Sequence, residues 1–232
     1  MINNHMKNGR RKGSKTRETI GAMKPVDLEE RLRRTLHNTS EEPPRPISPI
    51  ELPLGMDKLL TPRLLNSLRP AAVLVPVMRR PSGLTVMFTL RAETLRSHKG
   101  QISFPGGRRD EGDSSAAANA LREAQEETGL DPKHVEVIGF LDDYPTVTRY
   151  RVTPVVGMVA DAAELKIDPS EVAEVFEVPL TFLLKVENFE QKAFSNGGLN
   201  VPFFELNYQR WRIWGATAGM LWNLAQKAGQ VP

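Results

Sequence analysis

Cysteine is absent from all 232 residues of this chain. Disulfide bonds, thiolate metal sites and a cysteine nucleophile are therefore excluded. Absence of disulfides is compatible with any compartment, and we adopt a reducing cytoplasm as the expected location.

Long apolar runs are missing as well. The longest, from Ala71 to Met78, has eight residues and contains Pro76, whereas a membrane-spanning helix needs about 20 apolar residues. The sequence therefore predicts no membrane span. Its hydrophobic content of 40% is enough for one good core, so we expect one folded domain with extensions.

Acidic residues are scarce in the first 24 residues, which hold seven Lys and Arg against the single acid Glu18, a net charge of +6. Because the whole chain carries +3, the remainder is 3 − 6 = −3. The basic charge therefore belongs to a tail, and nucleic acid is not the expected partner. We predict that the tail is disordered, or lies upstream of the true start at Met6 or Met23. It lacks the apolar core of a secretory signal, and a mitochondrial presequence is the alternative.

Three parts follow from the pattern along the chain. Residues 1–24 form the tail, and residues 25–55 combine a short amphipathic helix with a proline-rich linker. Leucines at 28, 32 and 36 are spaced for one helix face, which would pack on the body or on a partner. Five prolines between 40 and 55 predict an extended segment. The folded domain is predicted to span residues 56–232.

Within that domain, alternating and apolar segments predict strands separated by turn residues. The expected strands are 71–77, 84–90, 101–104, 134–141, 150–159, 192–194, 201–206 and 209–213. Helices are expected at 115–128 and 216–228, and a short helical turn at 178–184. Asp113 or Ser114 is the expected cap of the first helix, and Gly129 is its expected C-terminal glycine.

The most informative segment runs from Gly106 to Leu130. Its helix carries Glu123, Glu126 and Glu127, which lie on one side of a single turn. Like charges this close repel one another, and hard divalent cations prefer such oxygen ligands. A solvated helix face could carry the same cluster, so the flanking residues decide between the two interpretations.

Those flanking residues favour a metal site. Gly106 and Gly107 have no Cβ, so the main chain could come close to a metal or a phosphate group. Arg122 precedes Glu126 by four residues and can pair with it across one turn.

Gly106–Leu130 resembles the Nudix box, G-x5-E-x7-R-E-U-x-E-E-x-G-U, in which U is aliphatic. Residues 122–130 match the second half, with alanine as a small U residue at 124. The first half departs from it, because Asp113 stands where the box has Glu and Arg122 follows nine residues later, not eight. This variant is similar to the coenzyme A diphosphatase branch. The similarity to that branch continues at 141–157 and 213–218. An upstream signature of the branch is also present: Leu90-Arg91, Leu95-Arg96, His98, Gly100-Gln101 and Ser103 to Gly107.

The resemblance implies an α/β fold, a Nudix-type α/β/α sandwich with a mixed sheet. It implies Mg²⁺ or Mn²⁺ bound by the three box glutamates and the carbonyl oxygen of Gly107. Arg122 would hold a box glutamate in its ligating pose. The implied reaction is hydrolysis of the diphosphate of coenzyme A, or of acyl-coenzyme A, to 3′,5′-ADP and (acyl-)4′-phosphopantetheine.

The general base is left open by the sequence. Nudix enzymes often draw a base or a further ligand from a later loop, and Glu171 is our choice there; a box glutamate and His98 are alternatives. Arg91, Arg96, His98 and Gln101 are the expected substrate-binding residues, because guanidinium groups suit phosphates.

Two other functions remain open. One is hydrolysis of a different nucleoside diphosphate derivative, such as ADP-ribose, NADH or a damaged nucleotide. The other is a non-catalytic Nudix module that senses a ligand or binds RNA. A small-molecule substrate is the expected partner in both hydrolase hypotheses, the coenzyme A diphosphatase and the hydrolase of another nucleoside diphosphate derivative. A homodimer is compatible with the sequence.

The composition of the tail generates one test. Deleting residues 1–24 should leave kcat and KM unchanged, because this charged segment is followed by a proline-rich stretch and contributes almost no apolar surface. Steady-state kinetics of the full and shortened chains measure the difference. A large loss of activity would show that the basic residues reach the substrate.

Overall fold

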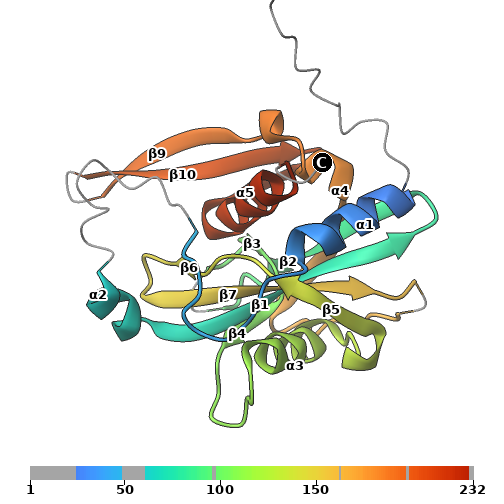
Figure 1. Cartoon of the computed structure of the whole chain (residues 1–232), viewed down its shortest axis with the longest axis horizontal. Coiled ribbons are helices and arrows are strands. Elements are labelled where there is room, and N and C mark those ends of the chain that lie inside the picture. Colours follow the sequence, from blue (N-terminus) through green and yellow to red (C-terminus); the bar gives the residue numbers. More distant parts are fainter. Residues whose placement is uncertain (1–24, 49–60, 96–97, 162, 197–198, 230–232) are drawn as a thin grey trace, which may run out of the picture.

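The computed structural model describes residues 25–48, 61–95, 98–161, 163–196 and 199–229. Its centre is a mixed sheet of eight strands (Figure 1). The strands are β1 (Arg69–Arg80), β2 (Gly83–Arg91), β3 (Ile102–Ser103), β4 (Gly106–Arg108), β5 (Val135–Phe140), β6 (Tyr144–Pro145), β7 (Tyr150–Val159) and β8 (Val172–Pro179). The main order is β3-β2-β1-β7-β5, while β4 pairs with β1, β6 with β7 and β8 with β2.

Strand β1 lies in the middle of this sheet. It runs parallel to β7 and antiparallel to β2 and β4. Leu74, Val75, Val77 and Met78 are all fully buried, because layers cover both faces of the strand. A continuous apolar run is what a strand covered on both sides requires.

Helices cover the two faces of the sheet. The α-helices are α1 (Pro25–Leu36), α2 (Pro62–Ser67), α3 (Ala116–Thr128), α4 (Leu180–Leu183) and α5 (Gly215–Gly229). Figure 1 shows α3 on one face and α1 and α5 on the other. The predicted α/β/α sandwich with a mixed sheet is confirmed.

A second, three-stranded antiparallel sheet lies beyond α5 (Figure 1). It consists of β9 (Glu190–Asn196), β10 (Leu199–Tyr208) and β11 (Trp211–Trp214). Phe204 on β10 stacks on Trp222 of α5, with ring centroids 4.5 Å apart. This contact packs the small sheet against the helix layer.

Helix α1 packs on the body of the protein. Leu28, Leu32 and Leu36 are at most 2% exposed and belong to the main apolar core. The sequence left open whether this face meets the body or a partner, and it meets the body. The boundary at residue 56 stays a prediction, because residues 1–24 and 49–60 lie outside the described ranges.

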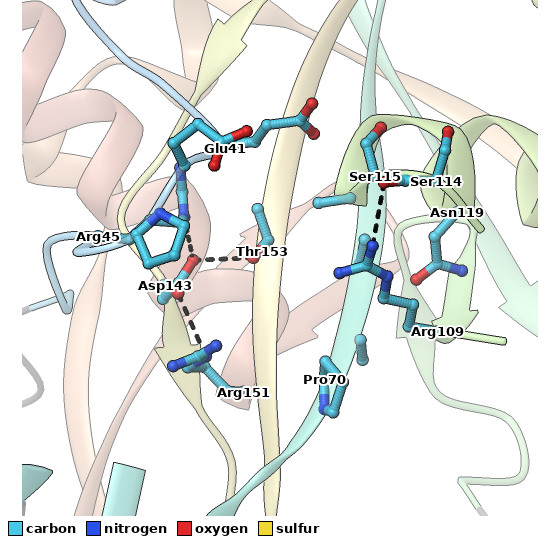
Figure 2. A pocket seen from close by; sticks show the side chains of 15 residues that line it. Glu41, Arg45, Pro70, Arg109, Ser114, Ser115, Asn119, Asp143, Arg151 and Thr153 are labelled. Carbon is cyan, nitrogen blue, oxygen red and sulfur yellow. Dashed lines mark hydrogen bonds and ion pairs between the residues drawn. The ribbon is translucent and has the colours of Figure 1, made fainter. Parts of the chain in front are cut away.

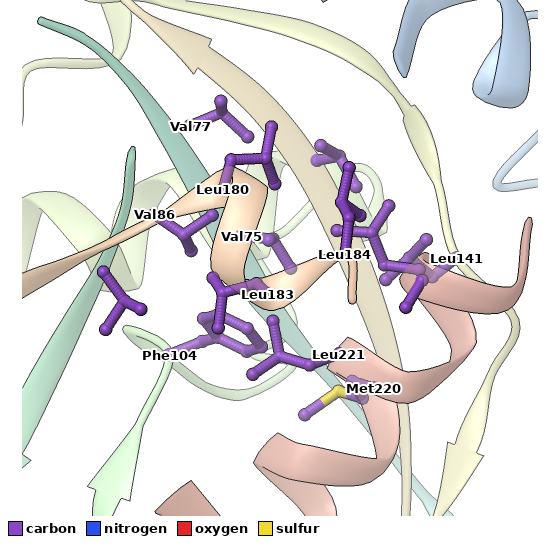
Figure 3. Packing of buried hydrophobic residues seen from close by; sticks show 14 of the residues in the cluster. Val75, Val77, Val86, Phe104, Leu141, Leu180, Leu183, Leu184, Met220 and Leu221 are labelled. Atoms are coloured by element: carbon purple, nitrogen blue, oxygen red, sulfur yellow. The ribbon is translucent and has the colours of Figure 1, made fainter. Parts of the chain in front are cut away.

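The main core lies between the sheet and the layer of α1, α4 and α5. Figure 3 shows Val75 and Val86 of the sheet facing Leu183 of α4 and Leu221 of α5. Phe104 is 2% exposed and stacks on Phe88 with centroids 5.1 Å apart. This layer of side chains joins the α4–α5 side of the molecule to the sheet.

Two details of the sequence prediction were wrong. The segment expected as a helical turn at 178–184 begins as the end of strand β8, and only Leu180–Leu183 is helical. Strand β8 pairs with β2 along most of its length, and its partial burial obscured its strand pattern. The cap of α3 is Ser115, whose hydroxyl accepts from the Ala118 amide.

No helix within the described ranges is long and apolar enough to cross a membrane.

The burial of α1 generates a stability test. Leu32→Ala should lower the free energy of unfolding by about 2–5 kcal/mol, since it removes a fully buried side chain from the main core. Glu30→Ala, on the exposed face of the same helix, should change it by less than about 0.5 kcal/mol. Denaturant titrations of both variants measure this, and equal effects would contradict the packing of α1 on the body.

Candidate active site

Helix α3 is delimited by its two caps. Ser115 begins it, and Gly129 ends it in a left-handed conformation with φ of 71° while its amide donates to the Gln125 carbonyl. Ala120 and Ala124 are at most 1% exposed, and such small side chains let the helix lie close to β1. This packing determines which side of α3 faces the sheet.

The three box glutamates therefore lie at different depths. The Glu127 side chain is 3% exposed, that of Glu123 is 17% exposed, and that of Glu126 is 56% exposed. Burial raises the pKa of Glu123 above its usual value, and Arg122 opposes that shift. The cluster runs from the protein interior to the surface.

Glu127 is the most unusual of these carboxylates. Its Oε1 lies 3.5 Å from Nη1 of Arg91, while its buried Oε2 has no hydrogen-bond partner. Burial raises the pKa of Glu127 to about 8, although the charge of Arg91 works against the shift. A buried, unpaired carboxylate oxygen is costly and is a strong acceptor for a cation.

Arg122 links the carboxylates around it. Its Nη1 donates to Glu126 at 2.8 Å and its Nη2 to Glu123 at 2.9 Å. Hydrogen bonds to Asp113 hold the pKa of Arg122 above its usual value. The guanidinium therefore orients two box glutamates at once, as the sequence predicted for one of them.

Asp113, which stands where the usual motif has Glu, binds Arg122. Arg122 donates to its two oxygens from Nε and Nη2, both at 3.0 Å, and the Asp110 amide donates to Oδ2 at 2.8 Å. Hydrogen bonding to Arg122 lowers the pKa of Asp113. The turn from Asp110 brings this shorter side chain within reach of the guanidinium.

Each glycine of the pair is required for a different reason. Gly106 has φ of 153° in β4, and a Cβ there would lie 2.4 Å from the Ala72 carbonyl oxygen of β1. A Cβ on Gly107 would lie 2.5 Å from the carboxylate of Glu123. The pair thus allows both the strand pairing and the close approach of a box carboxylate to the main chain.

Glu171 lies near the same carboxylates. It immediately precedes β8, and its charge acts on both Glu123 and Glu127. Its carbonyl accepts from the Ala92 amide at 2.8 Å, which ties it to the end of β2. Glu171 does not begin a helix, because strand β8 follows it.

Among the upstream signature residues, Arg91 faces Glu127. His98 Nδ1 and Gln101 Oε1 are 2.8 Å apart, and the Arg91 amide donates to the Gln101 carbonyl. Arg91, His98 and Gln101 line one cavity. Arg96 lies outside the described residues.

This donor set fits a divalent cation. Hard cations take carboxylate oxygens, and the unpaired Oε2 of Glu127 together with the Glu123 carboxylate against Gly107 supplies such oxygens. Within the described ranges, no three His, Asp and Glu side chains form a closed ligand set, because Glu123 and Glu126 turn to Arg122. Metal binding by these residues remains a prediction.

A mainly apolar cavity of about 470 Å³ adjoins the carboxylates. Arg91 and Gly106 form part of its wall beside Glu127, while Tyr144, Phe203 and Trp214 line it farther away. These aromatic residues come from β6, β10 and β11, which the sequence did not connect with the box. Only the position of the small sheet brings them together.

A second, polar pocket of about 250 Å³ lies at the beginning of α3 (Figure 2). Buried Asp143 there accepts from Arg45 Nε at 2.6 Å and from Thr153 at 2.9 Å. Glu41 accepts from the Ala117 amide at 3.1 Å. These contacts attach residues 41–45 to the sheet and to the helix end opposite the box glutamates.

The chain is similar to known proteins. A model of the NUDIX domain matches residues 68–196, more than half of the 232 residues. NudL of Cronobacter sakazakii, described as an uncharacterized Nudix hydrolase, is 42% identical over 190 residues, covering 78% of this chain and 98% of NudL. NudL of Escherichia coli K12 is 42% identical over 165 residues, covering 71% and 85%. The Nudix hydrolase RenU from M. smegmatis has a TM-score of 0.45 and 19% identity, covering 71% and 88%.

The mixed sheet between helices, with a glycine pair before the carboxylate-bearing helix on one of its faces (Figure 1), is the fold of an α/β protein, and the domain match makes it a hydrolase of the diphosphatase class. The domain match and the two relatives place the chain within that class. It belongs to the Nudix hydrolase family.

Some functional features were beyond the sequence argument. The spacing of the box glutamates was visible, and so was Asp113 as an irregular position. The sequence did not show that Asp113 is the bidentate partner of Arg122, because that role depends on the turn at Asp110. The substitution of Asp for Glu together with one extra residue was the available signal.

Glu127 generates a test of metal binding. Because its folded pKa of about 8 exceeds the usual 4.5, the folded state retains a proton that the unfolded state has lost. The free energy of unfolding should therefore fall as pH rises from about 4.5 to 8. In EDTA at pH 8.5, Glu127→Gln should melt above the wild type, and each kcal/mol corresponds to about 2–4 °C.

Added Mn²⁺ or Mg²⁺ should reverse this order. A cation that binds the folded state raises the Tm of the wild type, whereas the amide variant has lost a charged ligand and should shift less. Differential scanning calorimetry with and without the cation measures both differences. Equal shifts in the two proteins would remove Glu127 from the metal site.

Proposed function

We propose that this Nudix hydrolase cleaves the diphosphate of coenzyme A or acyl-coenzyme A with Mg²⁺ or Mn²⁺. The products are 3′,5′-ADP and (acyl-)4′-phosphopantetheine. One observation carries the proposal: Glu127, with a buried and unpaired Oε2, faces Arg91 through its Oε1, and Arg91 lines a cavity together with His98 and Gln101. The box and the upstream signature therefore meet at one place.

The reaction forms one P–O bond to water and breaks one bridging P–O bond. The water gives up a proton, and the leaving phosphate oxygen ends in a product phosphate. Bound metal would neutralise the non-bridging oxygens and acidify the water. Glu123, Glu126 and Glu127, with the Gly107 carbonyl, would hold it.

The residues around the metal site have separate tasks. Arg122 is a positioning residue, because it reaches Glu123, Glu126 and Asp113 through its hydrogen bonds. Glu171 accepts the proton of the water in this proposal. Its closeness to Glu123 and Glu127 supports that role, since a base must lie within reach of the metal-bound region.

The substrate is recognised at the cavity beside Glu127. Arg91 lies between that carboxylate and the cavity, where a guanidinium can bind a diphosphate oxygen. His98 and Gln101 hold one another in the loop that follows β2 and can donate to the substrate. Arg96 is assigned to phosphate binding from the sequence alone, because a guanidinium group suits phosphates.

The proposal also includes an expected location in the cell and an alternative substrate class. The relatives named above come from bacteria, and a cytoplasmic site of action remains our expectation from the sequence. ADP-ribose, NADH or a damaged nucleotide is the alternative substrate class.

A substrate panel tests the proposal. Purified protein with Mn²⁺ should release 3′,5′-ADP from coenzyme A, and dephospho-coenzyme A should react with a kcat/KM about tenfold to a hundredfold lower. A charge-assisted contact to the 3′-phosphate is worth about 1.5–3 kcal/mol. Ion-pair chromatography of the products, with ADP-ribose and NADH as further substrates, measures the rates.

Matched variants locate the catalytic groups. Glu127→Gln and Glu171→Gln should each reduce kcat by orders of magnitude, whereas Glu164→Gln, which changes an exposed acid before β8, should not. Faster cleavage of ADP-ribose or NADH would overturn coenzyme A as the substrate. Full activity of Glu171→Gln would exclude Glu171 as the base.

A further inference from the structure

The cavity beside Glu127 has walls from both sheets. β3 and β6 contribute from the main sheet, and Phe203 and Trp214 contribute from the small one. Helix α5 closes it with Ala216 and Met220. The small sheet and α5 are thus what convert an open sheet surface into an enclosed site.

The lining has few charged groups. Arg91 is the one Lys or Arg side chain among the described lining residues, and it already faces Glu127. A 3′-phosphate in an apolar enclosure would need cationic partners. The 3′,5′-ADP half of the substrate is therefore poorly matched to this cavity.

An uncharged, flexible arm matches it well. Apolar and aromatic walls with a few polar groups are typical of sites for such ligands, whose volumes are about 300–1,000 Å³, and this cavity measures about 470 Å³. Tyr144 adds a neutral hydroxyl, because burial raises its pKa to about 12. Gly219 makes room for its ring, since a Cβ there would lie 2.4 Å from it.

Apolar side chains form part of the rim of the cavity, where the exposed lining residues also include His98 and Thr148. Val147, in the turn between β6 and β7, is 75% exposed, and Phe194 of β9 is 38% exposed, although both belong to the lining. Exposed lining residues mark the side where the cavity opens to solvent. An apolar chain that outgrows the cavity would leave it along these two side chains.

We infer that this cavity receives the acyl-pantetheine arm of the substrate, so that acylated coenzyme A is preferred over free coenzyme A. The 3′,5′-ADP half remains outside. This inference rests on the proposed function and adds the orientation of the substrate and the part that determines its specificity.

A chain-length series tests the inference. The kcat/KM for 3′,5′-ADP release should rise from free coenzyme A through acetyl, butyryl and octanoyl esters by up to about fourfold per buried methylene group. It should level off for dodecanoyl and longer chains, which pass Val147 and Phe194 into solvent. Equal values for free and octanoyl-coenzyme A, with both cleaved, would overturn the inference and leave the proposed function intact.

Two variants and a matched control locate the effect. Val147→Asp places a charge at the apolar rim and should lower the octanoyl-to-free ratio of kcat/KM at least tenfold, whereas Leu64→Asp, at an exposed leucine of α2 outside the lining, should not. Ala216→Phe fills the cavity and should also lower the ratio. Unchanged ratios in folded Val147→Asp and Ala216→Phe would overturn the assignment of the cavity.

A binding measurement tests the assignment of the cavity without requiring cleavage of the substrate. Calorimetry with octanoyl-4′-phosphopantetheine should detect binding to the wild type that Val147→Asp weakens, while the affinity for 3′,5′-ADP stays the same in both. Failure to cleave any coenzyme A species would overturn the proposed function. Binding of octanoyl-4′-phosphopantetheine that ignores Val147→Asp would overturn the inference.

Discussion

Three carboxylates on one turn of α3 repel one another, and the surrounding structure is organised to tolerate them. Arg122 pairs with Glu123 and Glu126 and is itself held by Asp113. Glu127 faces the more distant Arg91 and has a buried oxygen without a hydrogen-bond partner. The repulsion is therefore relieved on the exposed side of the helix and retained on the buried side, where a cation would bind most strongly.

The helix keeps this arrangement because of how it packs. Ala120 and Ala124 turn one face toward β1, and Gly106 lets β4 pair with the same strand. Arg45 and Glu41 attach an N-terminal segment at the far end of α3. Carboxylates on a helix that its neighbours hold in this way keep a defined geometry.

Much of the fold could be predicted because its elements have strong local patterns. The apolar run around Val75, the helix expected at 115–128 and the leucines of α1 were each visible in the sequence and lie where the pattern indicated. Strand β8 was missed, since only Val172, Phe176 and Val178 of its eight residues are buried. Partial burial weakens the alternation by which a strand is recognised.

The sequence alone determined the chemistry of the box: three glutamates at helical spacing, an arginine one turn away and a glycine pair before them. Local geometry suffices there, because a helix places residues three and four apart on the same side. The tertiary structure decided which glutamate is buried, that Asp113 holds Arg122, and that Phe203 and Trp214 face the site from a second sheet. These relations join residues far apart in the chain, and only the packing of the two sheets around α5 brings them together.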